Sequence, residues 1–158
     1  MKRKSEPEIT RILQTYGDML YRTAYLLLGN PHDVQDVLQE VFLRYMEKSP
    51  CFASQDHEKA WLLRVTSNCC KDCLRFRKCH SYIDLELLQD YLPAPEEQHF
   101  IQELYALPAK WKTVLLLHYF EGYPVKEISK ITGLSENAVK KRLQRAREAL
   151  KLELVSAL

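Results

Sequence analysis

The amino-acid sequence predicts an all-α protein in which two small helical domains are joined by a flexible acidic linker. Two observations predict the helices: apolar residues recur at steps of three and four in the first half, and the second half carries a helix-turn-helix pattern. A third observation divides the chain, because residues 80–100 hold five acidic residues and no lysine or arginine. We therefore expect helical domains at 6–79 and 98–155, separated by a linker at 80–97.

Composition excludes several classes of protein. With 46% hydrophobic and 28% charged residues, the chain is globular rather than disordered. No apolar run approaches the roughly 18 residues that cross a bilayer. The sequence begins Met-Lys-Arg-Lys where a secretion signal needs an apolar stretch, so we expect a cytoplasmic location. The absence of a glycine-rich phosphate loop disfavours a nucleotide-dependent enzyme. We expect no enzyme activity, no cofactor and no small-molecule substrate.

The first helix is predicted from an apolar stripe that begins at Ile9, and it ends at Gly29. Asn30 then suits a helix N-cap and Pro31 the first position of a second helix, which the Ser49–Pro50 pair ends. The face opposite the apolar stripe of this second helix is acidic and polar, with Asp33, Asp36, Gln39 and Glu40.

A third helix is predicted over about residues 57–77, with Trp61 among the residues available for packing. Basic side chains are distributed along it: Lys59, Arg64, Lys71, Arg75, Arg77 and Lys78. In the second half, we expect a short helix near 98–106 and another that Pro108 opens and that ends near Gly122.

The helix-turn-helix follows. Residues 127–132 form its short first helix, Gly133 makes the turn, and Ser135 caps a second helix over 136–151. The inward face of this second helix has apolar residues at steps of four, three and four, namely Val139, Leu143, Ala146 and Leu150.

The last helix carries six basic residues against two acidic ones. Amide and basic side chains on such a helix reach base edges in the major groove or phosphate oxygens. We therefore predict DNA contacts from Ser135, Asn137, Lys140, Lys141, Arg142, Gln144, Arg145 and Arg147. The alternative interpretation is a solvated basic helix at the end of a small bundle.

The five cysteines are expected to be reduced thiols, because no secretion signal precedes them. The spacing of Cys70, Cys73, Cys79 and His80 can hold zinc, but Cys79 lies beyond the expected end of the third helix. Small buried or half-exposed thiols are the preferred interpretation, and no metal site is predicted.

Four stretches resemble bacterial extracytoplasmic-function sigma factors of the sigma-70 class. They are Asn30–Arg44 (NPHDVQDVLQEVFLR), Ala60–Arg75 (AWLLRVTSNCCKDCLR), Leu107–Leu117 (LPAKWKTVLLL) and Glu127–Arg147 (EISKITGLSENAVKKRLQRAR). The resemblance covers about residues 9–155, with both halves in order. Ser129 and Thr132 depart from the usual pattern by placing hydroxyls in the helix-turn-helix.

The resemblance implies a factor that binds core RNA polymerase and promoter DNA. It assigns contacts with the polymerase clamp helices to Asp33, Asp36, Gln39 and Glu40. It assigns recognition and melting of the minus-10 element to Trp61, Arg64, Asn68, Lys71, Asp72 and Arg75, with Trp61 either a base contact or a core residue. It assigns the second domain to the polymerase flap and the minus-35 element, and threads the acidic linker through the RNA-exit path.

The resemblance further implies a cognate anti-sigma factor, which can hold the protein at the inner face of the membrane. Two alternatives to a sigma factor are open. The first is an autonomous helix-turn-helix regulator that dimerises on a palindromic site. The second is a metal- or thiol-dependent redox sensor built on Cys69, Cys70, Cys73 and Cys79.

Overall fold

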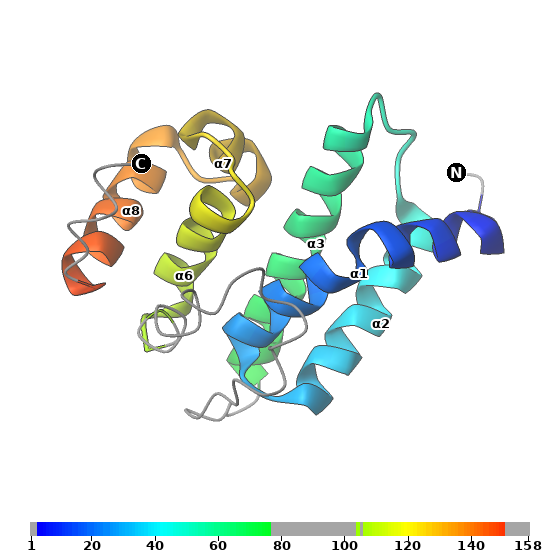
Figure 1. Ribbon diagram of the computed structural model, residues 1–158, viewed down its shortest axis with the longest axis horizontal. Helices are drawn as coiled ribbons and strands as arrows, with labels where there is room; N and C mark the ends of the chain where they lie inside the picture. Colours follow the sequence, from blue (N-terminus) through cyan, green and yellow to red (C-terminus); the bar gives the residue numbers. More distant parts are fainter. Residues whose placement is uncertain (1–2, 77–103, 105, 151–158) are drawn as a thin grey trace. The chain divides into compact units, whose positions relative to one another are not determined.

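The structure, a computed structural model, describes residues 3–76, 104 and 106–150. Every regular element in these residues is helical, which confirms the all-α prediction. The chain divides into two compact units, Met1–Pro93 and Ala94–Leu158, whose helices are coloured along the sequence in Figure 1. The predicted linker at 80–97 and most of the predicted short helix near 98–106 lie outside the described residues. Within the described part, no helix is both long and apolar enough to span a membrane.

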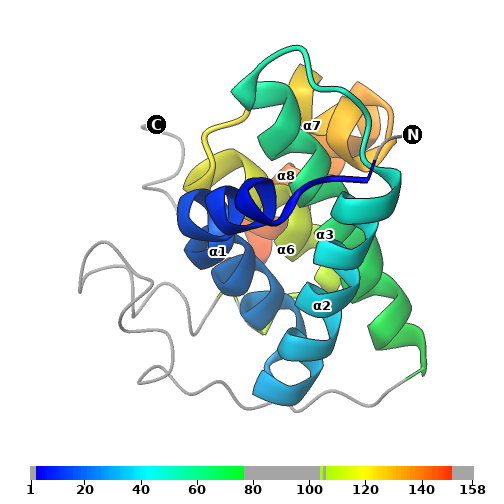
Figure 2. The ribbon, with the colours of Figure 1, turned by 90° about the vertical axis from the view of Figure 1, so that its right-hand side faces the viewer.

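The described part of the first unit is a bundle of three helices, α1 (Glu6–Leu28), α2 (Pro31–Lys48) and α3 (Gln55–Phe76). Each helix packs against the other two, as Figure 2 shows. The side chains that fill the interior come from all three helices and include Ile12, Leu20, Leu26, Val34, Val41, Leu62 and Leu63. Burial of these apolar stripes holds the bundle together and leaves the polar faces of α2 and α3 outside.

Two helices begin earlier than the sequence pattern indicates, because polar caps precede the apolar positions. The Glu8 carboxylate accepts hydrogen bonds from the Ser5 backbone N–H at 2.7 Å and the Ser5 hydroxyl at 2.9 Å, so α1 begins directly after Ser5. The Ser54 hydroxyl accepts from the His57 N–H at 3.1 Å. As a result, α3 begins at Gln55 rather than at the predicted residue 57.

The corner between α1 and α2 confirms the predicted boundary. Gly29 adopts a left-handed conformation with φ of 70°, and its N–H donates to the Tyr25 carbonyl at 2.7 Å. The Asn30 side chain accepts hydrogen bonds from the N–H groups of His32 at 2.8 Å and Asp33 at 3.4 Å.

A buried carboxylate, that of Glu58 on α3, ties the three helices of the first unit together. Its Oε2 accepts from Arg11 Nη2 of α1 at 2.8 Å and from the Tyr45 hydroxyl of α2 at 2.9 Å. Burial raises the pKa of Glu58, but the hydrogen bonds from Arg11 and Tyr45 and the guanidinium charge outweigh it, so this pKa is lowered. Burial and the hydrogen bond to Glu58 raise the pKa of Tyr45 to about 12.

The second unit contains α6 (Ala109–Leu115), a π-helical turn η2 (Leu116–Phe120), α7 (Val125–Thr132) and α8 (Glu136–Leu150). The last helix packs on α6 and α7. Its inward positions are buried as predicted: Val139, Leu143, Ala146 and Leu150. The helix-turn-helix therefore rests on an apolar seam.

The predicted helix that Pro108 opens is present, but its end differs from a continuous α-helix. The Glu121 N–H donates to the Leu116 carbonyl five residues back, at 3.2 Å, which is the π-helical pattern. Gly122, with φ of 74°, then turns the chain toward α7. The apolar pattern of the sequence does not distinguish α from π in a single turn.

We predict that Arg11→Met destabilises the first unit by about 1–3 kcal/mol, because Glu58 then keeps a buried charge with the Tyr45 hydroxyl alone. Arg44→Met, which breaks an exposed pair with Glu40, should cost under about 0.5 kcal/mol. Urea unfolding monitored by Trp61 fluorescence in a Trp111→Phe background measures both. Equal effects of the two variants would contradict the prediction.

We also predict that the Glu58 network weakens in acid. Because the folded pKa of Glu58 lies below the ordinary value of 4.5, its contribution is complete above pH 4.5 and is lost as pH falls through the folded pKa. Glu58→Gln should therefore lower the free energy of unfolding at pH 7 and reduce its further decrease toward pH 3. A variant that loses stability with pH as steeply as the parent protein would refute this.

Candidate nucleic-acid interface

The turn of the helix-turn-helix is held by hydroxyl groups. Ser129 Oγ donates to the Leu134 carbonyl at 2.5 Å, and Thr132 Oγ1 accepts from the Leu134 N–H at 3.3 Å. Gly133 adopts a left-handed conformation with φ of 76°, and Ser135 Oγ accepts from the Ala138 N–H at 3.1 Å. The two hydroxyls that depart from the usual sequence pattern thus satisfy backbone groups of the turn.

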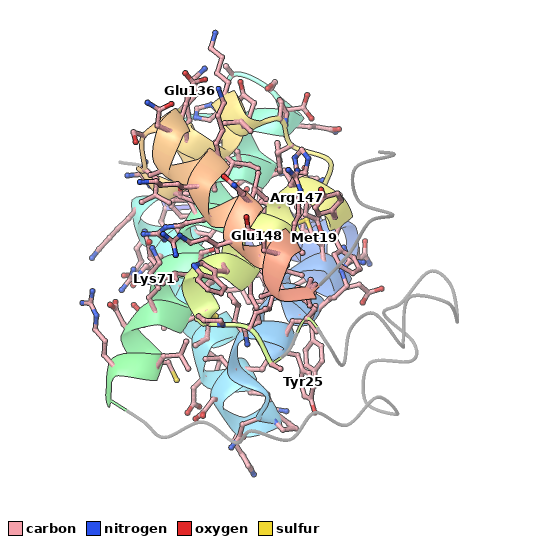
Figure 3. The ribbon with its side chains drawn as sticks, turned by 90° about the vertical axis from the view of Figure 1, so that its left-hand side faces the viewer. Met19, Tyr25, Lys71, Glu136, Arg147 and Glu148 are labelled. Atoms are coloured by element: carbon pink, nitrogen blue, oxygen red, sulfur yellow. The ribbon has the colours of Figure 1, made fainter. Side chains whose placement is uncertain are left out.

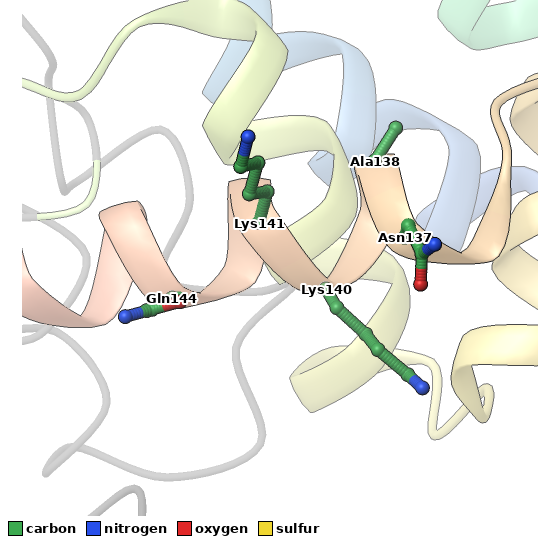
Figure 4. A pocket seen from close by; sticks show the side chains of 5 residues that line it. All are labelled: Asn137, Ala138, Lys140, Lys141 and Gln144. Carbon is green, nitrogen blue, oxygen red and sulfur yellow. The ribbon is translucent and has the colours of Figure 1, made fainter.

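The outer side of α8 presents amide and basic side chains. Those that are exposed are Ser135, Asn137, Lys140, Lys141, Gln144 and Arg145. A shallow hollow of about 560 Å³ is lined by five consecutive or near-consecutive residues of this helix, Asn137, Ala138, Lys140, Lys141 and Gln144. In Figure 4, Lys140 and Lys141 leave the helix on different sides of it. This arrangement allows the two lysines to reach phosphates on different sides of the helix.

Two predicted DNA contacts on α8 are less accessible than the rest. Arg142 and Arg147 are half-buried. The Nε of Arg147 donates to the Tyr119 hydroxyl at 2.9 Å, and its guanidinium carbon lies 5.8 Å from the centre of the Tyr119 ring. Arg147 is labelled on α8 in Figure 3. The helical periodicity placed Arg147 on an outward face, whereas the structure pairs it with a tyrosine of its own unit.

The predicted minus-10 residues lie along one side of α3. Arg64, Asn68, Asp72 and Arg75 are exposed, and Lys71 is half-buried. Their steps of three and four give a continuous stripe. Asp72 lies 3.8 Å from Arg75, which places a carboxylate among the cations.

Trp61 is half-buried rather than projecting from this stripe. Its ring meets Tyr45 edge-on with 6.1 Å between the ring centres, and Phe52 similarly at 5.8 Å. These contacts support the core role among the two left open by the sequence.

The acidic face of α2 is narrower than predicted. Asp36, Gln39 and Glu40 are exposed, but Asp33 is only 6% exposed in the first turn of the helix. The prediction that Asp33 lies on this outer face is therefore corrected. Leu43 is 47% exposed, and sequence analysis missed it. Its exposure could have been predicted, because it lies three residues after Glu40 and outside the apolar stripe of the helix.

A groove of about 330 Å³ separates part of α2 from α3. It is lined by Asp36, Val37, Glu40, Arg44, Cys69, Asp72 and Cys73. Burial raises the pKa of Cys69, which disfavours its reactive thiolate. No cluster of three or more potential metal ligands occurs in the described residues, and Cys79 and His80 lie outside them.

Comparison with known proteins identifies the architecture. Residues 12–79 match the family described as Sigma-70 region 2, and residues 100–150 match Sigma-70 region 4. The ECF RNA polymerase sigma factor SigM of Bacillus subtilis is 32% identical, over 90% of this chain and 93% of its own length. The chain belongs to the extracytoplasmic-function (ECF) sigma factors of the sigma-70 family.

Other relatives agree with this assignment. SigW of Bacillus subtilis, also an ECF sigma factor, is 29% identical over 98% of this chain and 92% of its own. The solved structure of CnrH in complex with the cytosolic domain of CnrY covers 97% of this ECF sigma factor and 90% of its own chain, with a TM-score of 0.65 and 25% identity. Sigma factor RpoE of Bartonella quintana, solved with the anti-sigma factor NepR, has a TM-score of 0.68 at 21% identity and shows the same fold.

The protein is thus a sigma factor that directs promoter-specific transcription initiation with RNA polymerase. An autonomous helix-turn-helix regulator would leave the region 2 match at residues 12–79 without a role.

We predict that Lys140→Gln and Lys141→Gln each weaken promoter binding by the holoenzyme in a salt-dependent way. A lysine that neutralises one phosphate contributes about 0.9 to the slope of log affinity against log salt concentration, so each loss should make the slope shallower by that amount. Lys48→Gln, which removes an exposed lysine at the end of α2, is the control and should leave the slope unchanged. Fluorescence anisotropy over a salt series gives the slopes; unchanged slopes for both α8 variants would argue against phosphate contacts there.

Proposed function

We propose that this ECF sigma factor divides its work among three exposed faces. The face of α2 with Asp36, Gln39 and Glu40 binds the clamp helices of core RNA polymerase. The outer stripe of α3 recognises and melts the minus-10 element. The outer side of α8 reads the minus-35 element, with residues 98–155 also contacting the polymerase flap.

The polymerase contact is supported by charge and by one apolar side chain. The family resemblance implies an arginine-rich clamp surface, and exposed carboxylates at one-turn spacing on α2 complement it. The half-exposed Leu43 lies on the same face and supplies an apolar anchor that a purely electrostatic contact lacks. Asp33 is left out of this face because it is buried.

The minus-10 contact is supported by the residue types on α3. Asn68 has both a donor and an acceptor for an unstacked base, while Arg64, Lys71 and Arg75 suit the phosphate backbone. Trp61 supports these residues from the aromatic cluster with Tyr45 and Phe52. Residues 6–79 form the unit that carries both this face and the polymerase-binding face.

The remaining roles follow from the family. The titles of two similar structures name partner proteins, the cytosolic domain of CnrY for CnrH and the anti-sigma factor NepR for RpoE. We propose that an anti-sigma factor likewise controls this protein. The acidic residues of 80–97 act as the linker between the regions, and the protein is a cytoplasmic initiation factor rather than an enzyme.

Reconstitution with cognate core RNA polymerase tests this function. The protein is mixed with core enzyme, and promoter DNA is selected from a random pool through the holoenzyme. We expect selected sequences with two conserved elements and weak promoter binding by the protein alone, since each region binds weakly without tethering. Tight, sequence-specific binding without core polymerase would favour an autonomous regulator instead, and failure to bind core would overturn the proposal.

We predict that the double variant Asp36→Lys/Glu40→Lys weakens core binding by on the order of 100-fold, because like charges then face the clamp surface. The matched control is Asp18→Lys/Asp56→Lys, which makes the same change in net charge at exposed positions of α1 and α3. Competition for core polymerase against the parent protein measures both, with circular dichroism to compare their helix content. Equal loss in the two variants would assign the effect to net charge rather than to this face.

A further inference from the structure

One basic residue of α8 is held in a way that sets it apart from the others. Arg147 Nε donates to the Tyr119 hydroxyl at 2.9 Å, and its guanidinium lies over the Tyr119 ring. We infer that Arg147 is a positioning residue: it braces α8 against the π-helical turn η2 and makes no contact with DNA phosphate. This inference rests on the proposed role of α8 in minus-35 recognition.

The π-helical turn presents the tyrosine that Arg147 uses. A π turn accommodates one more residue than an α turn, so it changes the direction in which the side chains after it leave the helix. Within η2, Leu116 and Leu117 are buried in the core, while Tyr119 is half-buried. The hydroxyl of Tyr119 is therefore available to α8 while its neighbours fix the turn from inside.

Tyr119 also contacts the ring of its neighbour His118. The His118 ring meets it edge-on at 4.7 Å between ring centres, and His118 Nδ1 lies 2.9 Å from the Tyr123 carbonyl oxygen. Since a carbonyl only accepts, Nδ1 carries the proton and donates. The chain from Tyr123 through His118 and Tyr119 to Arg147 joins the segment that leads into α7 to the C-terminal half of α8.

This chain of contacts joins the segment before α7 to α8 at the end of the helix-turn-helix farthest from its turn. Gly133 and Ser135 fix the near end, and the apolar seam beneath α8 is non-directional, so it does not by itself fix the angle of the helix. At the far end, the angle of α8 is restricted by a directional hydrogen bond from a guanidinium whose carbon lies 5.8 Å from the centre of the Tyr119 ring. The angle of α8 decides which base edges Asn137 reaches, so Arg147 affects promoter discrimination without contacting DNA itself.

Arg145 offers a matched comparison on the same helix. It is exposed, and among the described residues it has no hydrogen-bond or ion-pair partner. A guanidinium in that state is available to phosphate, whereas that of Arg147 is engaged by Tyr119. The two arginines should therefore respond differently to the same substitution.

The experiment uses the holoenzyme and a promoter fragment obtained by selection. Arg145→Gln should make the slope of log affinity against log salt shallower by about 0.9. Arg147→Gln should leave the slope unchanged but lower several-fold the ratio of affinities for the intact promoter and for one with a scrambled minus-35 element. Tyr119→Phe should lower the same ratio, and the double variant Tyr119→Phe/Arg147→Gln should lower it no further. A slope change with Arg147→Gln equal to that of Arg145→Gln, or additive losses in the double variant, would overturn the inference.

Two further measurements separate this inference from a simple effect on stability and from failure of the proposed function. Thermal unfolding shows whether each variant is fully folded at the assay temperature, and a purely structural role moves the unfolding midpoint without moving the discrimination ratio. Nitrogen-15 NMR of the arginine Nε–H groups tests the contact in the isolated protein. Because Arg44 Nε also donates, to Glu40 at 2.8 Å, the Arg147 signal is identified as the slowly exchanging one that Tyr119→Phe and Arg147→Gln both remove. Its absence from the parent protein would contradict the contact itself, whatever the polymerase does.

Discussion

The first unit depends on a single carboxylate oxygen that two other helices share. Glu58 Oε2 accepts from Arg11 of α1 and from Tyr45 of α2, so a shift of either helix along α3 breaks a charged hydrogen bond in a buried place. Apolar packing alone tolerates small sliding between helices, whereas this contact does not. Because the residues proposed to bind polymerase and minus-10 DNA lie on α2 and α3, the register of these two helices fixes the distance between the two faces.

In the second unit, the helices are held in place without a buried carboxylate among the described residues. Its helices are short, and the turn between α7 and α8 is held by the hydroxyls of Ser129 and Thr132 and by the cap at Ser135. These contacts fix only one end of α8. The other end has its apolar seam and the Tyr119–Arg147 pair, which lies partly at the surface. The contact that orients α8 is therefore made by an arginine, a residue type that is also common at DNA-binding surfaces.

Local signals predicted the elements that local interactions determine. The Gly29–Asn30 corner and the helix-turn-helix cap follow from left-handed φ values and from side chains bonded to nearby backbone, and both were predicted from the sequence. Features that depend on distant partners were missed. The burial of Asp33, the engagement of Arg147 by a tyrosine 28 residues earlier and the π turn depend on how helices pack, which periodicity does not encode. The exposure of Leu43 could have been predicted from the sequence, because this residue falls outside the apolar stripe of α2.

The net charge of +2 conceals the arrangement proposed above, in which each charged face meets a partner of opposite sign. In the proposed function, carboxylates on α2 face a cationic polymerase surface, and cations on α3 and α8 face phosphates. Salt screens both kinds of contact, so raising the salt concentration weakens assembly of the holoenzyme and promoter binding together. The dependence of transcription on salt concentration therefore combines the salt dependence of holoenzyme assembly with that of promoter binding. Only a titration with preformed holoenzyme, in which the polymerase contact is saturated, isolates the slope that belongs to DNA.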